Sequence, residues 1–226
     1  GMSKPRVFID GQQGSTGLRI NALLARRQDI ALLRIEESRR KDPAARAQCL
    51  NDADFAVLCL PDAASAEAVE MVGDGDTRLI DTSTARRLES GWTYGLPELS
   101  AEQRDAIRGS SRVANPGCYP QTFILAIRPL VEAGIVSASS PLTVNAVSGY
   151  SGGGRKMVED YQKAAPVESG DASVAYCLYG LDGVHKHMAE MQSYSLVDHP
   201  PLFVPSIDHS FCGMLVSVPL PAQMVP

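Results

Sequence analysis

The chain has 226 residues, of which 44% are hydrophobic and 21% are charged, as in an ordinary globular protein with a sizeable core. Its formal net charge of −5 gives no overall positive field, so we predict neither nucleic acid nor a membrane surface as a partner. Five scattered cysteines without a Cys-x-x-Cys pair argue against a disulfide framework and against any metal site. They favour a reduced, cytoplasmic protein.

Short apolar runs alternate with helical patterns in the first half of the chain. The patterns predict strands at 7–10, 30–35, 55–60 and 77–81, and helices at 18–24, 43–53 and 63–72. Strands that alternate with helices at short spacing are typical of a parallel sheet covered on both faces. We therefore predict an α/β, Rossmann-type doubly wound domain over residues 3–117.

The second half has longer strands and fewer helices. A strong helix at 121–133 precedes predicted strands at 142–147, 176–178, 202–204 and 214–219. This pattern predicts an α+β domain over residues 118–226 with a mostly antiparallel sheet. The chain closes on a strand and a proline-rich run, so we expect the domain to need a C-terminal segment beyond this sequence.

Three glycines, Gly11, Gly14 and Gly17, stand between the first predicted strand and the first predicted helix. Glycine allows a tight turn and a close approach to a pyrophosphate, which the N–H groups of a helix start attract. The alternative is a simple turn in which Ser15 or Thr16 caps the helix. The strand before and the helix after favour a dinucleotide site that includes all five residues.

The segment after the second strand bears on which dinucleotide binds. An acidic residue there would hold the ribose 2′-OH of NAD, whereas an arginine would hold the 2′-phosphate of NADP. Both charges occur, but the three cations after Ser38 favour NADP, with Ser38 and Arg39 as contacts. A solvated charged loop is the alternative. Ser83 follows a later strand, where ligands bind in open α/β sheets, and is a further predicted cofactor contact.

Cys118 lies in Asn115-Pro116-Gly117-Cys118-Tyr119-Pro120, directly before an apolar helix. The positive end of a helix and its unpaired N–H groups stabilise a thiolate, which is the nucleophilic form of cysteine. Polar and glycine neighbours set Cys118 apart from Cys59, which lies inside an apolar strand and fits a small core residue. We predict that Cys118 is a nucleophile.

A thiolate needs an acid–base partner, and His185 and His187 flank a lysine in the second half of the chain. Glu190 follows His187 by three residues, so on a helix it would either orient that imidazole or cap the helix. We predict a catalytic role for all three.

A second glycine cluster runs from Ser148 to Gly154 and is followed by Arg155 and Lys156. Backbone N–H groups beside cations suit a phosphate, although a flexible hairpin is the alternative. We predict cofactor contacts at Ser151, Gly152 and Gly153, and substrate contacts at Asn115, Ser148 and Arg155.

With these motifs in this order, the chain resembles the N-acetyl-γ-glutamyl-phosphate reductase family. It is most similar to the shorter type 2 branch of that family, within the aspartate-semialdehyde dehydrogenase superfamily. The resemblance implies an arginine-biosynthesis enzyme with an NADP-binding Rossmann domain and a catalytic, oligomer-forming α+β domain, as a homodimer or homotetramer. It also implies that Cys118 is the nucleophile that forms a thioester with a small acyl-phosphate substrate, and that His187 is the acid–base.

Two other functions stay open on the sequence. A related reductase would act on another acyl phosphate, such as aspartyl phosphate. A catalytically inactive NADP-binding regulator would bind cofactor without a reactive thiol.

Overall fold

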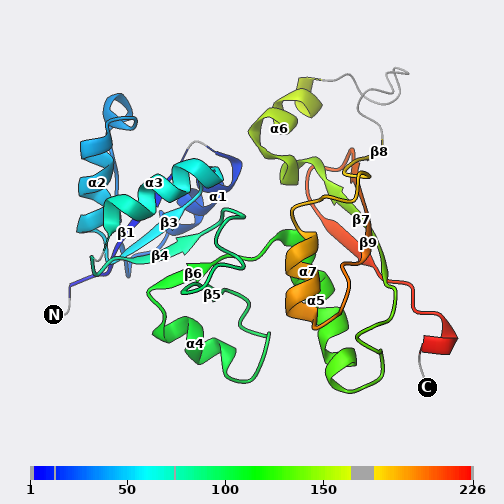
Figure 1. Cartoon of the computed structure of the whole chain (residues 1–226). Coiled ribbons are helices and arrows are strands. Elements are labelled where there is room, and N and C mark those ends of the chain that lie inside the picture. Colours follow the sequence, from blue (N-terminus) through cyan, green and yellow to red (C-terminus); the bar gives the residue numbers. More distant parts are fainter. Residues whose placement is uncertain (1–2, 13, 74, 164–175, 225–226) are drawn as a thin grey trace. The chain divides into compact units, whose positions relative to one another are not determined.

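The computed structural model describes residues 3–12, 14–73, 75–163 and 176–224. The chain divides into two compact units, Gly1–Pro116 and Gly117–Pro226 (Figure 1).

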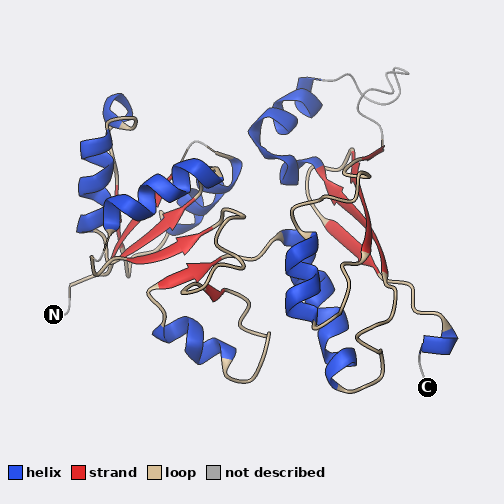
Figure 2. Ribbon diagram, viewed as in Figure 1, coloured by secondary structure: helices blue, strands red, loops and turns tan. Residues whose placement is uncertain are grey.

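The first unit is built on one parallel sheet whose strand order is β2-β1-β3-β4-β6-β5. Its strands are drawn in red in Figure 2. Every strand pair in it is parallel, which confirms the predicted Rossmann-type architecture. Strand β2 pairs with one edge of β1, and the chain then crosses back so that β3 pairs with the other edge of β1. Its elements are β1 (Arg6–Asp10), α1 (Ser15–Leu24), β2 (Ala31–Leu33), the 3-10 helix η1 (Glu37–Arg39), α2 (Pro43–Asp52), β3 (Phe55–Leu58), α3 (Asp62–Val72), β4 (Arg78–Asp81), β5 (Thr93–Tyr94), α4 (Gln103–Gly109) and β6 (Arg112–Ala114).

The hydrophobic core of the first unit lies between the central strands and the helices α2 and α3. Helix α2 begins where Asp42 accepts a hydrogen bond from the backbone N–H of Ala44 and Pro43 occupies the first turn, two strong start signals. Its buried face then packs with that of α3 against the sheet. The buried members of this cluster are Phe8, Leu50, Ala53, Ala56, Leu58, Ala68, Val72 and Leu79.

The second unit carries a four-stranded sheet in the order β10-β7-β9-β8. The β10–β7 and β8–β9 pairs are antiparallel, as predicted, but the longest pair, β7–β9, is parallel, so the sheet is mixed. Its elements are α5 (Cys118–Glu132), β7 (Thr143–Gly149), the 3-10 helix η2 (Tyr150–Gly153), α6 (Gly154–Lys163), β8 (Cys177–Leu178), α7 (Met188–Ser195), β9 (Leu202–Asp208), β10 (Met214–Ser217) and the 3-10 helix η5 (Ala222–Met224).

Strand β9 extends four residues beyond the predicted end at 204. Pro205 explains the error, because a proline lacks a backbone donor and usually ends a strand pattern. Here the hydroxyl of Ser206 donates to the Ala146 carbonyl of β7 at 2.7 Å, and the ladder continues past the proline.

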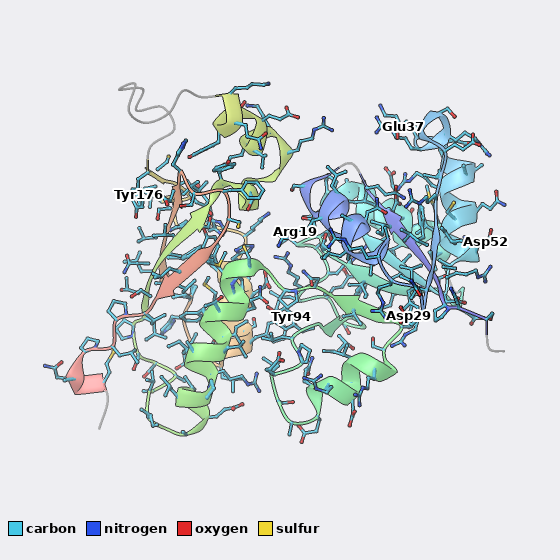
Figure 3. All side chains as sticks on the ribbon, turned by 180° about the vertical axis from the view of Figure 1, so that it is seen from behind. Arg19, Asp29, Glu37, Asp52, Tyr94 and Tyr176 are labelled. Atoms are coloured by element: carbon cyan, nitrogen blue, oxygen red, sulfur yellow. The ribbon has the colours of Figure 1, made fainter. Side chains whose placement is uncertain are left out.

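Helices α5 and α7 cover one face of this sheet. Side chains alternate along a strand, so the residues between the core positions lie on the other face. Leu202 and Leu215 there are 65% and 63% exposed. Tyr176, just before β8 and labelled in Figure 3, is 59% exposed. The core face is closed by Tyr119, Phe123, Ile127, Val144, Ala146, Met191 and Phe203. Among the described residues, no helix is both long and apolar enough to cross a lipid bilayer.

Candidate active site

Cys118 is the first residue of α5, and Gly117 is its N-cap. The sequence predicted a helix start at Gln121. That position was wrong because Pro120 lies in the first turn, where a helix loses nothing from a missing backbone N–H. Tyr119, Phe123 and Ile127 recur every four residues and are buried, which turns Cys118 to the exposed side of the helix. The thiol therefore lies at the helix start and away from the core.

Glu190 holds the start of this helix from another part of the chain. Its carboxylate is 1% exposed and accepts a hydrogen bond from the backbone N–H of Gly117 at 3.0 Å. A buried carboxylate is stabilised by the positive end of a helix. The predicted capping role of Glu190 thus applies to α5 and the cysteine on it, rather than to its own helix α7.

His185 and His187 lie against Tyr119, the residue that follows Cys118. The ring centroids of Tyr119 and His187 are 5.8 Å apart, and those of the two histidines 4.8 Å apart. The backbone N–H of His187 donates to Nδ1 of His185 at 3.2 Å. His187 is the N-cap of α7 and is 5% exposed. The structure therefore brings both predicted histidines to the residue beside the predicted nucleophile.

Burial, followed by the charge of Lys186, lowers the pKa of His185 from its ordinary value of 6.5. The unfolded chain then binds more protons than the folded chain between the two pKa values. The free energy of unfolding should be highest above about pH 6.5 and should fall as the pH drops toward the folded-state pKa. In His185→Asn, which keeps an acceptor, this part of the decline should disappear. Denaturant titrations of both proteins at about pH 7.5 and about pH 5.5 measure the decline in the free energy of unfolding. Equal declines in wild type and His185→Asn would contradict the prediction.

The second glycine cluster serves the fold in part. A Cβ on Gly149 would lie 2.7 Å from backbone atoms of Cys212, so the segment just before β10 can approach only a glycine there. The N–H of Ser151 donates to the Phe211 carbonyl at 2.9 Å and is already engaged. Gly152 and Gly153 complete η2, and the exposed Arg155 of α6 pairs with Glu159 at 2.7 Å. Ser148 is 7% exposed and accepts a hydrogen bond from the Tyr119 hydroxyl at 2.9 Å.

The first unit contains a pocket of about 470 Å³ at the point where the strand order reverses. Residues after β1, β2 and β3 line it, among them Gly11, Ile35 and Leu60. Ligands of open α/β sheets bind at such a reversal, outside the carboxyl ends of the strands. Gly11 and Gly14 lie in the pocket wall, while Ser15, Thr16 and Gly17 form the first turn of α1.

This loop has the backbone shape that a dinucleotide requires. Gly11 has φ +87, and a Cβ on it would overlap the Cys59 carbonyl. A Cβ on Gly17 would overlap the Gly11 carbonyl, so only glycine lets the strand, turn and helix pack so closely. The N-cap Gly14 leaves the helix start open to an anion. These residues fit a nicotinamide dinucleotide.

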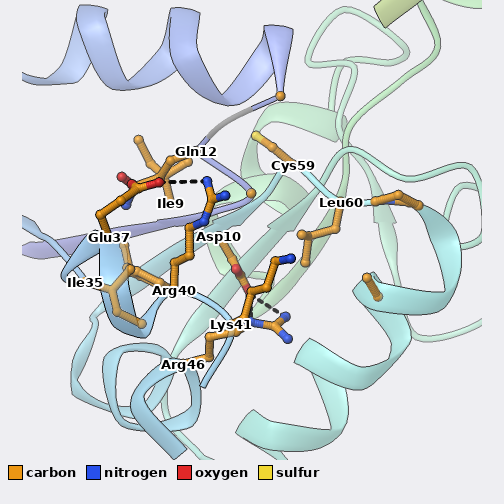
Figure 4. Close-up of a pocket in the computed structure, with 15 residues that line it drawn as sticks. Ile9, Asp10, Gln12, Ile35, Glu37, Arg40, Lys41, Arg46, Cys59 and Leu60 are labelled. Carbon is orange, nitrogen blue, oxygen red and sulfur yellow. Dashed lines mark hydrogen bonds and ion pairs between the residues drawn. The ribbon is translucent and has the colours of Figure 1, made fainter. Parts of the chain in front are cut away.

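Two of the three cations that follow Ser38, Arg40 and Lys41, line this pocket. Arg39 pairs with Asp42 at 3.0 Å, and neither Ser38 nor Arg39 lines the pocket. Arg40, Lys41 and Arg46 do (Figure 4). Arg40 pairs with Glu37 at 2.9 Å, and Arg46, from α2, pairs with the buried Asp10 at 2.9 Å.

Two predicted residues lie at the carboxyl ends of β4 and β6. Ser83 is 5% exposed, and its hydroxyl has no hydrogen-bond partner among the described residues. Asn115 is exposed, and its backbone N–H donates to the Asp81 carbonyl at 2.7 Å. A buried hydroxyl without a partner at this edge of the sheet also fits a bound ligand. In the described part of the chain, no three His, Cys, Asp or Glu side chains group as metal ligands would.

Comparison with known families agrees with this division of the chain. Residues 6–107 match the model "Semialdehyde dehydrogenase, NAD binding domain", and residues 118–225 match "Semialdehyde dehydrogenase, dimerisation domain". An N-acetyl-gamma-glutamyl-phosphate reductase of Mesorhizobium japonicum is 48% identical over 96% of this chain and 69% of its own length. N-acetyl-gamma-glutamyl-phosphate reductase 2 of a Nostoc species is 46% identical over 97% of this chain and 69% of its own length. The chain belongs to the N-acetyl-γ-glutamyl-phosphate reductase family.

Solved structures related to this reductase-family chain share its fold. Aspartate semialdehyde dehydrogenase II of Vibrio cholerae, complexed with ASA, superposes with a TM-score of 0.70 at 16% identity, over 98% of this chain and 77% of the other. Aspartate semialdehyde dehydrogenase of Candida albicans, with NADP, superposes with a TM-score of 0.62 at 13% identity, over 97% of this chain and 74% of the other. The two family models, rather than these structures, identify the first unit as a nicotinamide-cofactor domain and place a dimerisation domain in the second.

Sequence reasoning missed several residues of this reductase-family site. Asp10 ends β1 and could have been noticed for its place beside the glycine loop. Arg46 lies one helical turn inside α2 and carries no local signal. Tyr119 stood within the cysteine motif, but its contact with Ser148 spans 29 residues and no pattern in the sequence indicates it.

Proposed function

We propose that the chain catalyses the NADPH-dependent reduction of N-acetyl-γ-glutamyl phosphate to N-acetylglutamate semialdehyde, in arginine biosynthesis, through a thioester on Cys118. The observation that carries this proposal is an exposed cysteine at the start of α5, with His185 and His187 packed against the next residue. The two units would be the cofactor domain and the catalytic domain.

In the first step, His187 takes the proton of the Cys118 thiol, and the thiolate attacks the acyl carbon. The bond to phosphate breaks, His187 returns the proton to the leaving phosphate, and a thioester remains. When bound, NADPH supplies the hydride that reduces the thioester carbon. Backbone N–H groups of Cys118 and Tyr119, in the first turn of α5, would donate to the oxyanion that then forms. Its collapse releases the aldehyde and restores the thiolate.

The surroundings of the histidines favour His187 as the acid–base. His185 accepts a hydrogen bond at Nδ1, and its lowered pKa keeps it neutral near pH 7, which suits a residue that positions its neighbour. Glu190 lies three residues after His187, in the first turn of α7, and therefore on the same side of that helix. A carboxylate there would stabilise a protonated imidazole.

The reverse reaction tests this proposal and separates it from the two alternatives. The protein is expected to reduce NADP⁺ with N-acetylglutamate semialdehyde only when phosphate is present, and far more slowly with aspartate semialdehyde. A preference for aspartate semialdehyde would assign a related reductase. Cofactor binding without turnover of either aldehyde would assign a regulator.

We propose NADP rather than NAD as the cofactor because Arg40, Lys41 and Arg46 line the pocket. Lys41→Ala should raise the KM for NADP⁺ by about 10-fold to 100-fold, since a charged contact to a phosphate contributes roughly 1.5–3 kcal/mol. The KM for NAD⁺ should stay unchanged. Arg39→Ala should have a smaller effect, because Asp42 engages Arg39 outside the pocket. Steady-state kinetics with both cofactors decide this, and a larger loss in Arg39→Ala would restore the contact predicted from sequence.

We also propose that the chain acts as a homodimer or homotetramer, assembled through the open face of the second sheet. Leu178, Leu202 and Leu215 are 48%, 65% and 63% exposed on that face, and large apolar side chains exposed on one face are typical of interfaces. Light scattering coupled to size exclusion gives the mass in solution. We place the protein in a reducing compartment such as the cytoplasm because its five cysteines are scattered along the sequence without a Cys-x-x-Cys pair.

A further inference from the structure

Three hydroxyl groups form a line beside the start of α5. The Tyr179 hydroxyl donates to the Tyr119 hydroxyl at 3.1 Å, and Tyr119 donates to Oγ of Ser148 at 2.9 Å. Tyr119 is 2% exposed and Ser148 is 7% exposed. These residues come from three separate segments: the first turn of α5, the end of β7, and the turn after β8.

The order of donors in this line fixes where each proton goes. Burial, and then the hydrogen bond to Tyr119, raise the pKa of Tyr179, so its phenol keeps its proton and donates. Tyr119 accepts that bond and must direct its single proton to Ser148. Because Ser148 accepts in turn, its own hydroxyl proton is left to donate to a different acceptor.

The space beside Ser148 suits a ligand. Ser148 directly precedes Gly149 and the glycine-rich η2. Oγ of Ser148 is the nearest atom to a Cβ placed on Gly152, at 3.9 Å. Glycine therefore leaves the neighbourhood of the hydroxyl open, and Tyr119 links this neighbourhood to Cys118, the residue before it.

We propose that Ser148 donates a hydrogen bond to a phosphoryl oxygen of the acyl phosphate, and that Tyr119 and Tyr179 are positioning residues that direct this donor. The inference rests on the proposed function. Phosphoryl oxygens at neutral pH mainly accept hydrogen bonds, so a serine held as a donor binds them, whereas a serine free to rotate can present a lone pair instead. Loss of the Tyr179 hydroxyl, away from the ligand, should therefore weaken phosphate binding.

The test is the dependence of the reverse reaction on inorganic phosphate. Ser148→Ala should raise the KM for phosphate about tenfold, and Tyr179→Phe about fivefold, with kcat and the KM for the semialdehyde changed less than twofold. Ser148→Thr, which keeps a hydroxyl, should recover most of the loss. Tyr161→Phe, a ring stacked on Tyr150 in the same unit, is the matched control and should leave all constants unchanged.

A double-mutant cycle decides whether Tyr179 acts through Ser148. In the Ser148→Ala background, Tyr179→Phe should have no further effect on the KM for phosphate. An undiminished fivefold effect there would overturn the inference, as would an unchanged KM for phosphate in Ser148→Ala. If the wild-type protein shows no phosphate-dependent turnover, the proposed function itself fails. Calorimetric titration with inorganic phosphate then tests Ser148 directly, and equal affinity in wild type and Ser148→Ala would overturn its role.

Discussion

Cys118→Ala should lower phosphate-dependent turnover by more than about a thousandfold while the protein still folds and binds cofactor. The size of the loss follows from the role of the thiol, because no thioester can form without it. Cofactor binding should persist because the glycine loop and the pocket lie wholly in the first unit. Steady-state assays, with cofactor binding measured by fluorescence, check both parts. Turnover within tenfold of wild type would contradict the covalent mechanism.

Alkylation at neutral pH provides an independent measure of the same thiol. Cys118 is exposed at a helix start, whereas burial raises the pKa of Cys59 to about 11. Iodoacetamide should therefore modify Cys118 first, with Cys59 among the slowest, and acyl phosphate should protect Cys118. Cys177→Ala is the matched control, since Cys177 is also exposed but should not affect turnover. Faster labelling of Cys177 than of Cys118 would argue against an activated thiol.

Gly17→Ala should destabilise the first unit by about 3 kcal/mol, because the added methyl group overlaps the Gly11 carbonyl. The Gly11 carbonyl and the Cα that carries the new methyl group both belong to the backbone, so neither can move without displacing the turn between β1 and α1. Thermal or denaturant unfolding measures the change, and the affinity for cofactor should fall with it.

Gly14→Ala separates folding from binding within the same loop. A Cβ there lies 3.6 Å from the nearest atom, the Gly11 carbonyl oxygen, which is ordinary contact, so stability should change by less than about 1 kcal/mol. The methyl group would nevertheless stand in the pocket wall, and cofactor affinity should drop about tenfold or more. Equal stabilities for the Gly14 and Gly17 variants would show that the loop relaxes. Unchanged cofactor affinity in Gly14→Ala would place the dinucleotide elsewhere.

Helices and strands were predicted correctly where the sequence shows a clear apolar pattern, and were not predicted where the element is too short to show one. Strands β1, β3 and β4 and helices α2 and α3 follow their apolar periodicity. Strand β5 has two residues and helix α4 has seven, too few for a period to appear, and neither was predicted. The parallel pairing of β9 with β7 was not predicted because strand direction depends on how β9 returns to β7, which no alternation of side chains encodes.

Local patterns were enough to predict the alternation that makes a parallel sheet, the glycine loop after β1, and the position of Cys118 beside the start of an apolar helix. These features are local, because periodicity, turn chemistry and helix starts depend on residues within a few positions of one another. The folded chain, by contrast, brings Glu190 to the start of the helix of Cys118 across 73 residues. It also brings Arg46 rather than Arg39 to the pocket, and Tyr179 and Tyr119 into line with Ser148. Such pairings arise when packing brings distant segments together, and a buried charge or hydroxyl then requires whichever partner the fold supplies.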